Sequence, residues 1–331
     1  MTLASIPAVF GRRELTLLAA CVLAFAAFSL ISPYFGTAAN LSTILRNSVE
    51  LLLIGLGMTL LLAMGGIDVS VGILMGIAAF VVGQTLMGGL PAPLAALLGP
   101  LTGALLGVVT ATVVVLGRIP PIVGTLGLLG VYRTAIFVLL GGQWLSGIPT
   151  DLTSLVASRI LGIPVAAYVI ALAYAAVFVA LRLTPYGAHL LAIGNNEEKA
   201  RLTGVAVVRT RFLTFVASGF LCGVAATFYV ATYRNVEMAI GSTLALEAIA
   251  AVVLGGTSIL GGRCTLIGTV LGVLLIRILQ NGLLLSGIPS LWQMVVTGGL
   301  LLAVLTLDTL SARGSDGGRT SRLKLRGGVA R

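Results

Sequence analysis

The sequence predicts an all-α integral membrane protein with about ten transmembrane helices. Of the 331 residues, 58% are hydrophobic and only 9% are charged, and the mean hydropathy is +1.13. Soluble domains carry about 25% charged residues, so this chain cannot cover a water-exposed surface. Apolar runs of roughly 20 residues, the length that crosses a bilayer, recur along the chain. The 43 glycines are typical of helices that pack closely in lipid.

The chain divides into ten apolar segments that we expect to be membrane spans. They are 15–31, 45–64, 69–87, 91–116, 119–140, 161–183, 212–232, 246–261, 264–285 and 289–310. Residues 1–310 therefore form one transmembrane domain. The tail at 311–331 is basic, rich in glycine and serine, and has no apolar periodicity, so we expect it to be disordered and cytoplasmic.

The basic residues favour one orientation of this domain. If the N-terminus is cytoplasmic and the spans alternate, 15 of the 20 basic residues fall in cytoplasmic loops or the tail. The other five are Arg46, Arg133, Arg159, Arg234 and Arg277. This bias fits the positive-inside rule and places both termini in the cytoplasm. The net charge of +10 therefore indicates membrane orientation and not nucleic-acid binding, since no aromatic residues are interleaved with the charges.

The longest polar interruption between apolar segments is the loop at 184–211, which the predicted orientation places in the cytoplasm. Its middle has the pattern of a short capped helix, with Asn195 as the N-cap and Glu198 at the N3 position of a capping box. Gly204 follows at a position suited to a left-handed C′ residue. A short charged helix between two membrane blocks suits contact with a soluble partner, and an ordinary solvated loop is the alternative.

Glycine-rich joints separate some of the spans. We expect tight turns or broken helices at Gly65–Gly72 and Gly255–Gly262, although close helix packing also explains single glycines. GxxxG patterns at Gly103–Gly107 and Gly268–Gly272 echo each other. If the echo is real, spans two to five and seven to ten are inverted repeats, as in many transporters.

Several polar side chains fall within or beside the apolar segments, where an ionised group costs about 2.5–3.5 kcal/mol at mid-membrane. The candidates for lining a solute path are Asp68, Glu247, Arg277, Gln280 and Asn281. The last three lie within about one helical turn, so we expect them to face the interior of the bundle. Glu247 lies near the outer end of its segment, where we expect it to be hydrated or paired with Arg234.

Two other charged positions have structural interpretations. Asp68 immediately precedes a span, and we expect it to be the N-cap of a helix that begins at Val69. Glu50 and Arg46 lie four residues apart on one helix face and can satisfy each other.

Motifs for enzymatic chemistry are missing from the sequence. It contains no GxxxxGK[ST] phosphate loop and no HExxH motif, and it has one histidine and three widely separated cysteines. We therefore expect no catalytic residues, no metal site and no cofactor in this chain. The few buried acids favour passage of a neutral polar solute over ion coupling.

Four glycine-containing motifs occur at Gly65–Gly72 (GGIDVSVG), Ile119–Gly127 (IPPIVGTLG), Ala192–Gly204 (AIGNNEEKARLTG) and Leu254–Gly262 (LGGTSILGG). Together they resemble motifs of the permease subunits of bacterial ABC importers for monosaccharides. The resemblance extends from about residue 40 to 310. Within the family, the stretches Ile119–Arg133 and Gly141–Leu152 look most like the autoinducer-2 permeases.

The resemblance implies a transmembrane permease in a bacterial inner membrane that imports autoinducer-2 or a monosaccharide such as ribose or rhamnose. Its partners would be a second permease chain, identical or a sister, a periplasmic solute-binding protein, and ABC ATPase subunits that hold ATP and magnesium. The family's ATPase-contacting segment matches residues Gly194, Asn195, Glu197, Glu198, Ala200, Arg201, Thr203 and Gly204. The competing readings are an ion-coupled secondary transporter and a membrane-embedded enzyme.

Overall fold

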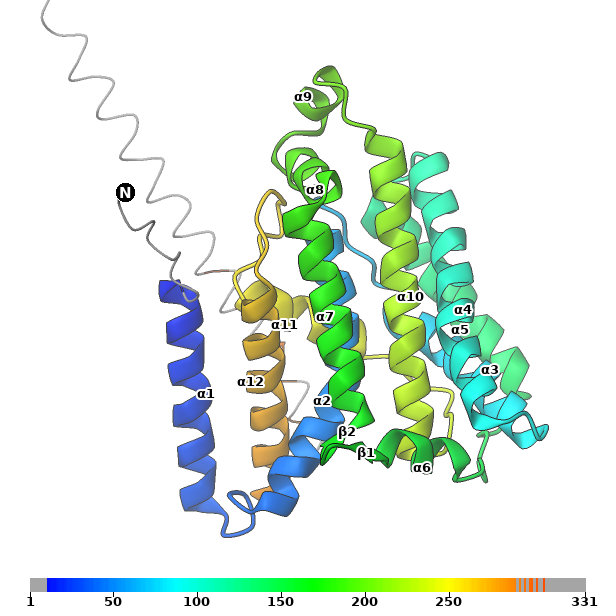
Figure 1. Ribbon diagram of the computed structural model, residues 1–331, viewed down its shortest axis with the longest axis vertical. Helices are drawn as coiled ribbons and strands as arrows, with labels where there is room; N and C mark the ends of the chain where they lie inside the picture. Colours follow the sequence, from blue (N-terminus) through cyan, green and yellow to red (C-terminus); the bar gives the residue numbers. More distant parts are fainter. Residues whose placement is uncertain are drawn as a thin grey trace, which may run out of the picture.

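Long apolar helices run side by side through most of the chain (Figure 1). The computed structural model describes residues 11–289 and, beyond them, 292, 295, 298, 299, 302 and 306. Its elements are α1 (Arg12–Ile31), α2 (Ala38–Ala63), α3 (Val71–Met87), α4 (Ala92–Ala111), the π-helix η1 (Thr112–Leu116), α5 (Pro121–Leu140), α6 (Asp151–Ala157), β1 (Arg159–Ile160), β2 (Ile163–Pro164), α7 (Val165–Leu183), α8 (Pro185–Asn195), α9 (Glu197–Leu202), α10 (Val207–Tyr233), α11 (Leu244–Leu254) and α12 (Leu266–Leu285).

Seven of the described helices are long and apolar enough to cross a membrane, and α3 and α11 are shorter apolar helices. Nine of the ten predicted segments correspond to α1–α5, α7 and α10–α12. The tenth, 289–310, lies almost entirely outside the described residues, as does the predicted tail at 311–331. A total of ten helices and the positions of both termini therefore stay predictions.

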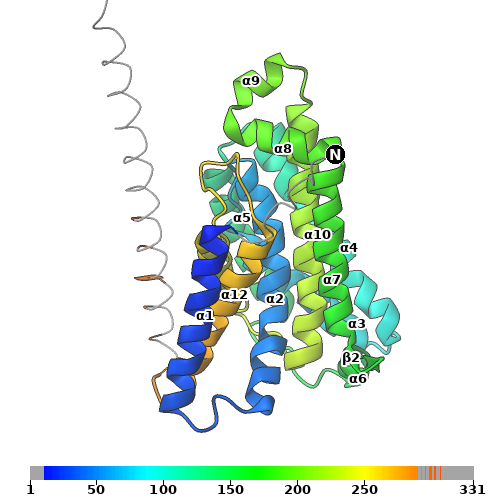
Figure 2. The ribbon, with the colours of Figure 1, turned by 60° about the vertical axis from the view of Figure 1, so that its left-hand side comes forward.

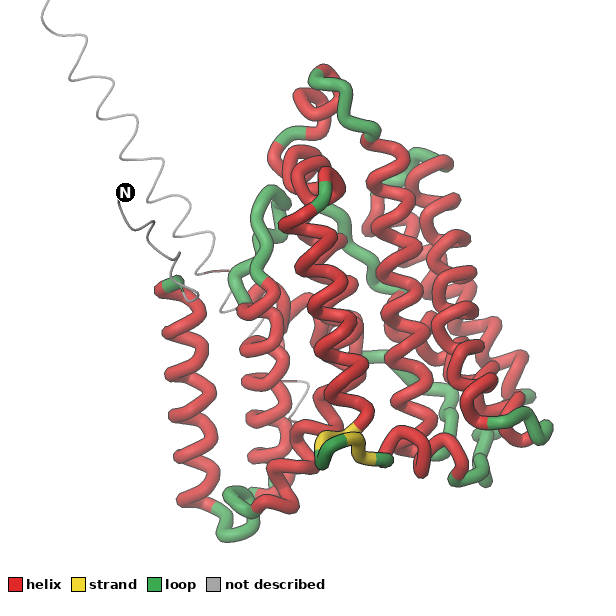
Figure 3. The backbone as a smooth tube through the Cα atoms, viewed as in Figure 1, coloured by secondary structure: helices red, strands yellow, loops and turns green. Residues whose placement is uncertain are grey.

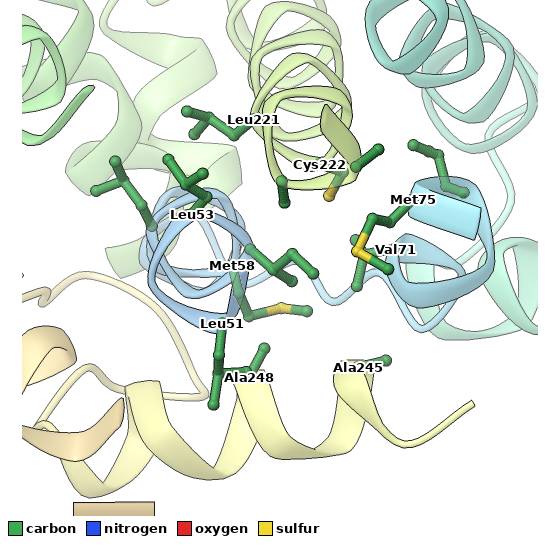
Figure 4. Close-up of a cluster of buried hydrophobic side chains, with 14 of the residues drawn as sticks. Leu51, Leu53, Met58, Val71, Met75, Leu221, Cys222, Ala245 and Ala248 are labelled. Carbon is green, nitrogen blue, oxygen red and sulfur yellow. The ribbon is translucent and has the colours of Figure 1, made fainter. Parts of the chain in front are cut away.

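Helix α2 lies at the centre of the bundle. Of its most apolar stretch, 83% is buried, against 6% for α7 at the periphery. Leu51, Leu53 and Met58 of α2 face side chains from α3, α10 and α11 (Figure 4). A helix that is hydrophobic on all sides is stable only in such an enclosed position or in lipid, so the apolar sequence of α2 is explained by its central place.

Helices α4 and α10 approach closely along a stripe of glycines. A Cβ atom on Gly103 would lie 2.2 Å from the carbonyl oxygen of Gly219, and one on Gly223 would lie 2.1 Å from that of Gly99. The GxxxG pattern of the fourth predicted span is therefore a helix–helix contact, which is the usual role of small residues in membrane helices.

Two non-helical segments enter the bundle from opposite ends and approach each other inside it. Residues 64–70 turn back from the end of α2, and residues 234–243 return from the end of α10 (Figures 1 and 3). The second segment reaches the start of α3, just after the first, where a Cβ atom on Gly72 would lie 2.0 Å from the Gly241 carbonyl oxygen. The expectation of a broken helix at the first joint is confirmed. Non-helical backbone at this depth is possible because protein surrounds it.

Several predicted boundaries are wrong in informative ways. The predicted loop at 184–211 contains two helices, α8 and α9, and ends before Val207, where α10 begins. The sixth segment begins at Val165 instead of residue 161, because residues 159–164 form the β1–β2 hairpin, in which Arg159 pairs with Pro164. The eighth segment ends as a helix at Leu254. Hydropathy reports only how apolar a stretch is. Apolar residues continue beyond the ends of these helices, so hydropathy does not detect where the backbone turns.

Candidate functional site

Helices α8 and α9 project from one end of the bundle (Figures 1 and 2). The side chain of Asn196 caps α9, because its Oδ1 accepts a hydrogen bond from the Lys199 backbone N–H at 2.8 Å. Gly204 follows the C-cap with φ of +84°, as predicted. The expected N-cap at Asn195 and the capping box with Glu198 are wrong by one residue. Asn195 instead ends α8 and donates to the Leu191 carbonyl at 2.9 Å.

The surface of α9 is charged and largely exposed. Glu197 pairs with Arg201 at 3.1 Å and with Arg211 of α10 at 2.9 Å. Glu198 is exposed, and Leu202 at the tip is 82% exposed. Ala200 and Thr203 complete the turn, with Ala200 buried and its carbonyl accepting from the Thr203 hydroxyl at 2.9 Å.

An apolar cavity of about 610 Å³ lies beside α9, where α10 begins and η1 ends. Its lining consists of Leu116, Arg201, Val205, Ala206, Val207, Val208, Arg209, Phe212 and Leu213. Two of the lining residues are arginines, and one of them, Arg201, is paired with Glu197.

The base of the α8–α9 segment contacts both broken parts of the bundle through closely packed backbone, with the Asn195 side chain against Gly262. A Cβ atom on Gly194 would lie 2.1 Å from the Ala63 carbonyl oxygen and 2.3 Å from the Gly262 nitrogen. The Gly262 N–H donates to the Ala63 carbonyl at 2.9 Å, and Gly261 lies against Gly65 and Gly194. We call Gly65, Gly194, Gly261 and Gly262 the glycine junction. It joins the end of α8 to the joint after α2 and to the loop between α11 and α12.

A hydrogen bond also ties α8 to α10. The Tyr186 hydroxyl lies 2.8 Å from the Thr214 hydroxyl. Burial raises the pKa of Tyr186, with the Thr214 hydrogen bond acting in the opposite direction. Tyr186 therefore stays neutral at physiological pH and holds the two helices together as a hydrogen-bonding phenol.

A buried ion pair lies in the other half of the bundle. Arg277 Nη1 of α12 is 3.2 Å from Glu247 Oε2 of α11, and the two side chains are 15% and 11% exposed. The same Nη1 donates to Gln280 Oε1 at 2.7 Å. The expected pairing of Glu247 with Arg234 is wrong, because Arg234 Nε donates to the Ile148 carbonyl at 2.9 Å. Glu247 therefore points inward, toward Arg277.

A third charge lies close to this ion pair. Glu50 of α2 is 4% exposed, and its Oε1 has no hydrogen-bond partner among the described residues. It interacts electrostatically with both Arg277 and Glu247. The described side chains show no ion pair between Glu50 and Arg46, so the expected intrahelical pair is wrong; helical spacing allowed it, but Glu50 faces the core.

Beside the ion pair is a polar cavity of about 140 Å³, hereafter the polar cavity. It is lined by Ile44, Asn47, Tyr233, Arg277, Gln280, Asn281 and Leu284. Asn281 Oδ1 accepts a hydrogen bond from Asn40 Nδ2 at 2.9 Å. The sequence grouped the three α12 residues correctly, but it missed Asn47 of α2 and Tyr233, the last residue of α10, because neither carries a charge that marks it within an apolar segment.

Asp68 lies apart from this cavity. It is 2% exposed, and its Oδ1 accepts from the Ser70 backbone N–H at 2.8 Å and the Ser70 hydroxyl at 2.6 Å. The expected N-cap role is wrong, because α3 begins at Val71 and Asp68 instead holds the turn before it. Its carboxylate therefore stabilises the joint and does not line the polar cavity.

Comparisons with known proteins place the chain in a family. Residues 40–305 match the family model described as "Branched-chain amino acid transport system / permease component". The autoinducer 2 import system permease protein LsrC of Enterobacter sp. (strain 638) is 38% identical over 89% of this chain and 86% of its own length. The ribose import permease protein RbsC of Bacillus subtilis (strain 168) is 36% identical, over 85% and 88%. No solved structure matches the chain. The chain therefore belongs to this family of membrane transport permeases.

Proposed function

We propose that the chain forms the transmembrane path of an ATP-driven importer for a small neutral sugar-like solute, with autoinducer-2, ribose and rhamnose as the first candidates. Its similarity to import permeases for autoinducer 2 and ribose supports this assignment. The chain itself is not an enzyme, and ATP and magnesium are held by a separate ATPase subunit. A second permease chain and a periplasmic solute-binding protein complete the importer in a bacterial inner membrane.

One observation carries the proposal: the α8–α9 segment projects from the bundle and joins both broken regions through the glycine junction. An ATPase that moves this segment displaces the joint after α2 and the loop before α12 together. The charged surface of α9 and the apolar cavity beside it supply the docking site. Backbone contacts transmit such a displacement directly, because Gly194 packs against the backbone of Ala63 and Gly262 without a side chain of its own.

The packing is in keeping with an inverted repeat that relates α2–α4 to α10–α12. Helix α3 packs on α10 as α11 packs on α2, and α4 packs on α10 as α12 packs on α2.

Helix α1 begins at the end of the bundle that carries α8 and α9 (Figure 1). We therefore assign that end and the N-terminus to the cytoplasm.

The test is reconstitution of the chain with its ATPase and binding protein in proteoliposomes. We expect accumulation of labelled ribose or autoinducer 2 that requires ATP and is blocked by vanadate. Uptake that ignores both would overturn the proposal.

The second candidate function is ion-coupled secondary transport, which the unpartnered carboxylate of Glu50 favours because buried acids serve as proton or ion sites in such carriers. It predicts uptake by this chain alone that an ionophore abolishes. The same proteoliposomes without the ATPase separate the two functions.

A further inference from the structure

We propose that the polar cavity is a selective binding site for a neutral polyhydroxylated solute within the permease. This inference rests on the proposed import function and adds a point of recognition inside the membrane domain. Helices α2, α10 and α12 supply its walls, and all its lining residues lie in or next to the outer halves of these helices if the α8–α9 segment is cytoplasmic.

The cavity presents unused hydrogen-bonding groups. The side chains of Asn47 and Tyr233 line it without a hydrogen-bond partner among the described residues. Gln280 accepts from Arg277 through Oε1, and Asn281 accepts from Asn40 through Oδ1, so each retains its amide N–H groups as donors. Groups that both donate and accept, arranged around a small space, match the hydroxyls of a polyol.

The charge on the cavity wall is compensated. Arg277 is the charged residue among the described residues that line the cavity, and it is paired with Glu247 at 3.2 Å. An anion would have to displace the Glu247 carboxylate from Arg277, and a cation would approach the Arg277 guanidinium. A neutral solute avoids both costs, since it needs no uncompensated counter-charge.

The volume and the apolar lining of the polar cavity limit the size of the solute that it can hold. The volume of about 140 Å³ is small beside the roughly 300–1,000 Å³ of sites for drug-sized ligands. Ile44, Leu284 and the Tyr233 ring provide apolar surface for the C–H faces of the solute. The cavity therefore suits a compact molecule of a few carbons and several hydroxyls, in the size range of a pentose.

The test measures selectivity in the complete importer. Ribose and 2-deoxyribose serve as paired probes, with the same binding protein throughout, so that the preference of the binding protein cancels between variants. Asn47→Leu and Gln280→Leu each remove an amide from the cavity. We expect at least one of them to reduce the ribose to 2-deoxyribose ratio of kcat/KM by about threefold to tenfold, the value of one hydrogen bond.

The matched control is Gln84→Leu, an exposed amide on α3 outside the cavity. It is expected to leave the ratio unchanged. A purely structural role for Asn47 or Gln280 would lower uptake of both probes equally. An unchanged ratio in both cavity variants, with ATP-dependent uptake intact, overturns this inference while the importer function stands. Loss of ATP dependence in the wild-type complex instead overturns the proposed function.

A second measurement detects occupancy of the cavity directly and does not require transport. The complex with Asn47→Cys, in a Cys264→Ser background, is treated with a membrane-impermeant maleimide in the presence of ribose or autoinducer 2. We expect one of these to slow labelling at least threefold relative to equimolar sodium chloride, and to leave a Gln84→Cys variant unaffected. Equal labelling rates under all conditions contradict a solute site here.

Discussion

The α8–α9 segment and the wall of the polar cavity each have a glutamate–arginine ion pair, but one pair is exposed to solvent and the other is largely buried. The Glu197–Arg201 pair has side chains that are 36% and 68% exposed, whereas those of Glu247 and Arg277 are 11% and 15% exposed. Exposed pairs contribute little to stability because water screens them. Buried pairs are costly to break because the remaining charge is left without a partner. The first network is therefore available for a partner protein, and the second fixes helices α11 and α12.

The largest expected effect is at the buried pair. Glu247→Ala leaves Arg277 charged and unpaired, which we expect to cost about 3–5 kcal/mol of stability. Thermal unfolding of the purified protein in detergent measures the loss. The double variant Glu247→Leu with Arg277→Met is expected to recover most of it, because the unpaired guanidinium is then gone and the neighbouring buried carboxyl of Glu50 can be accommodated in its neutral form. Equal stability of the single and double variants would contradict the assignment.

The next effect concerns the link between the two regions. Gly194→Ala places a methyl group against the Ala63 carbonyl and the Gly262 nitrogen, so the backbones must separate. We expect ATP hydrolysis to continue while solute uptake falls at least tenfold. Gly130→Ala, at a position where a Cβ atom meets nothing within 4 Å, is the matched control. Retained coupling in Gly194→Ala would mean that the glycine junction does not transmit movement.

A smaller effect tests which asparagine caps α9. Asn196→Ala removes the hydrogen bond to the Lys199 N–H and is expected to cost about 1 kcal/mol. Hydrogen exchange of the α9 amides reports the local loss. Asn195→Ala removes a bond inside α8 only and should leave α9 protected. If Asn195→Ala exposed the α9 amides to exchange and Asn196→Ala did not, Asn195 would be the cap, as the sequence predicts.

The smallest effect on stability is expected at Glu198. It is exposed and makes no capping contact, so Glu198→Arg should leave the free energy of unfolding unchanged within about 0.5 kcal/mol. The reversed charge is instead expected to weaken co-purification of the ATPase subunit. A variant that binds the ATPase as the wild type does would remove α9 from the docking surface.

Local sequence information predicted much of this architecture. Apolar runs located nine of the ten expected segments among the described helices, and the i, i+3 spacing of Arg277 and Gln280 placed them together. The glycines at 65 and 66 marked a real break. These features depend on composition or on neighbours within one turn, which the sequence displays directly.

The errors have a common physical cause. Glu247 and Arg277 are 30 residues apart. The sequence alone does not distinguish Arg277 from Arg234 as the partner of Glu247, because the choice depends on how the helices pack. Asn195 and Asn196 are chemically equivalent caps, and the choice depended on where α8 ended. The return of residues 234–243 into the bundle gave no hydropathy signal. Each case was decided by tertiary packing.

The contact between Gly72 and Gly241 has an electrical consequence. The start of α3 and residues 234–243 come from opposite ends of the bundle, and their backbones pack together there without an intervening side chain. Such close packing leaves no room for water or ions between them, so in this conformation the contact blocks ion leakage at that point.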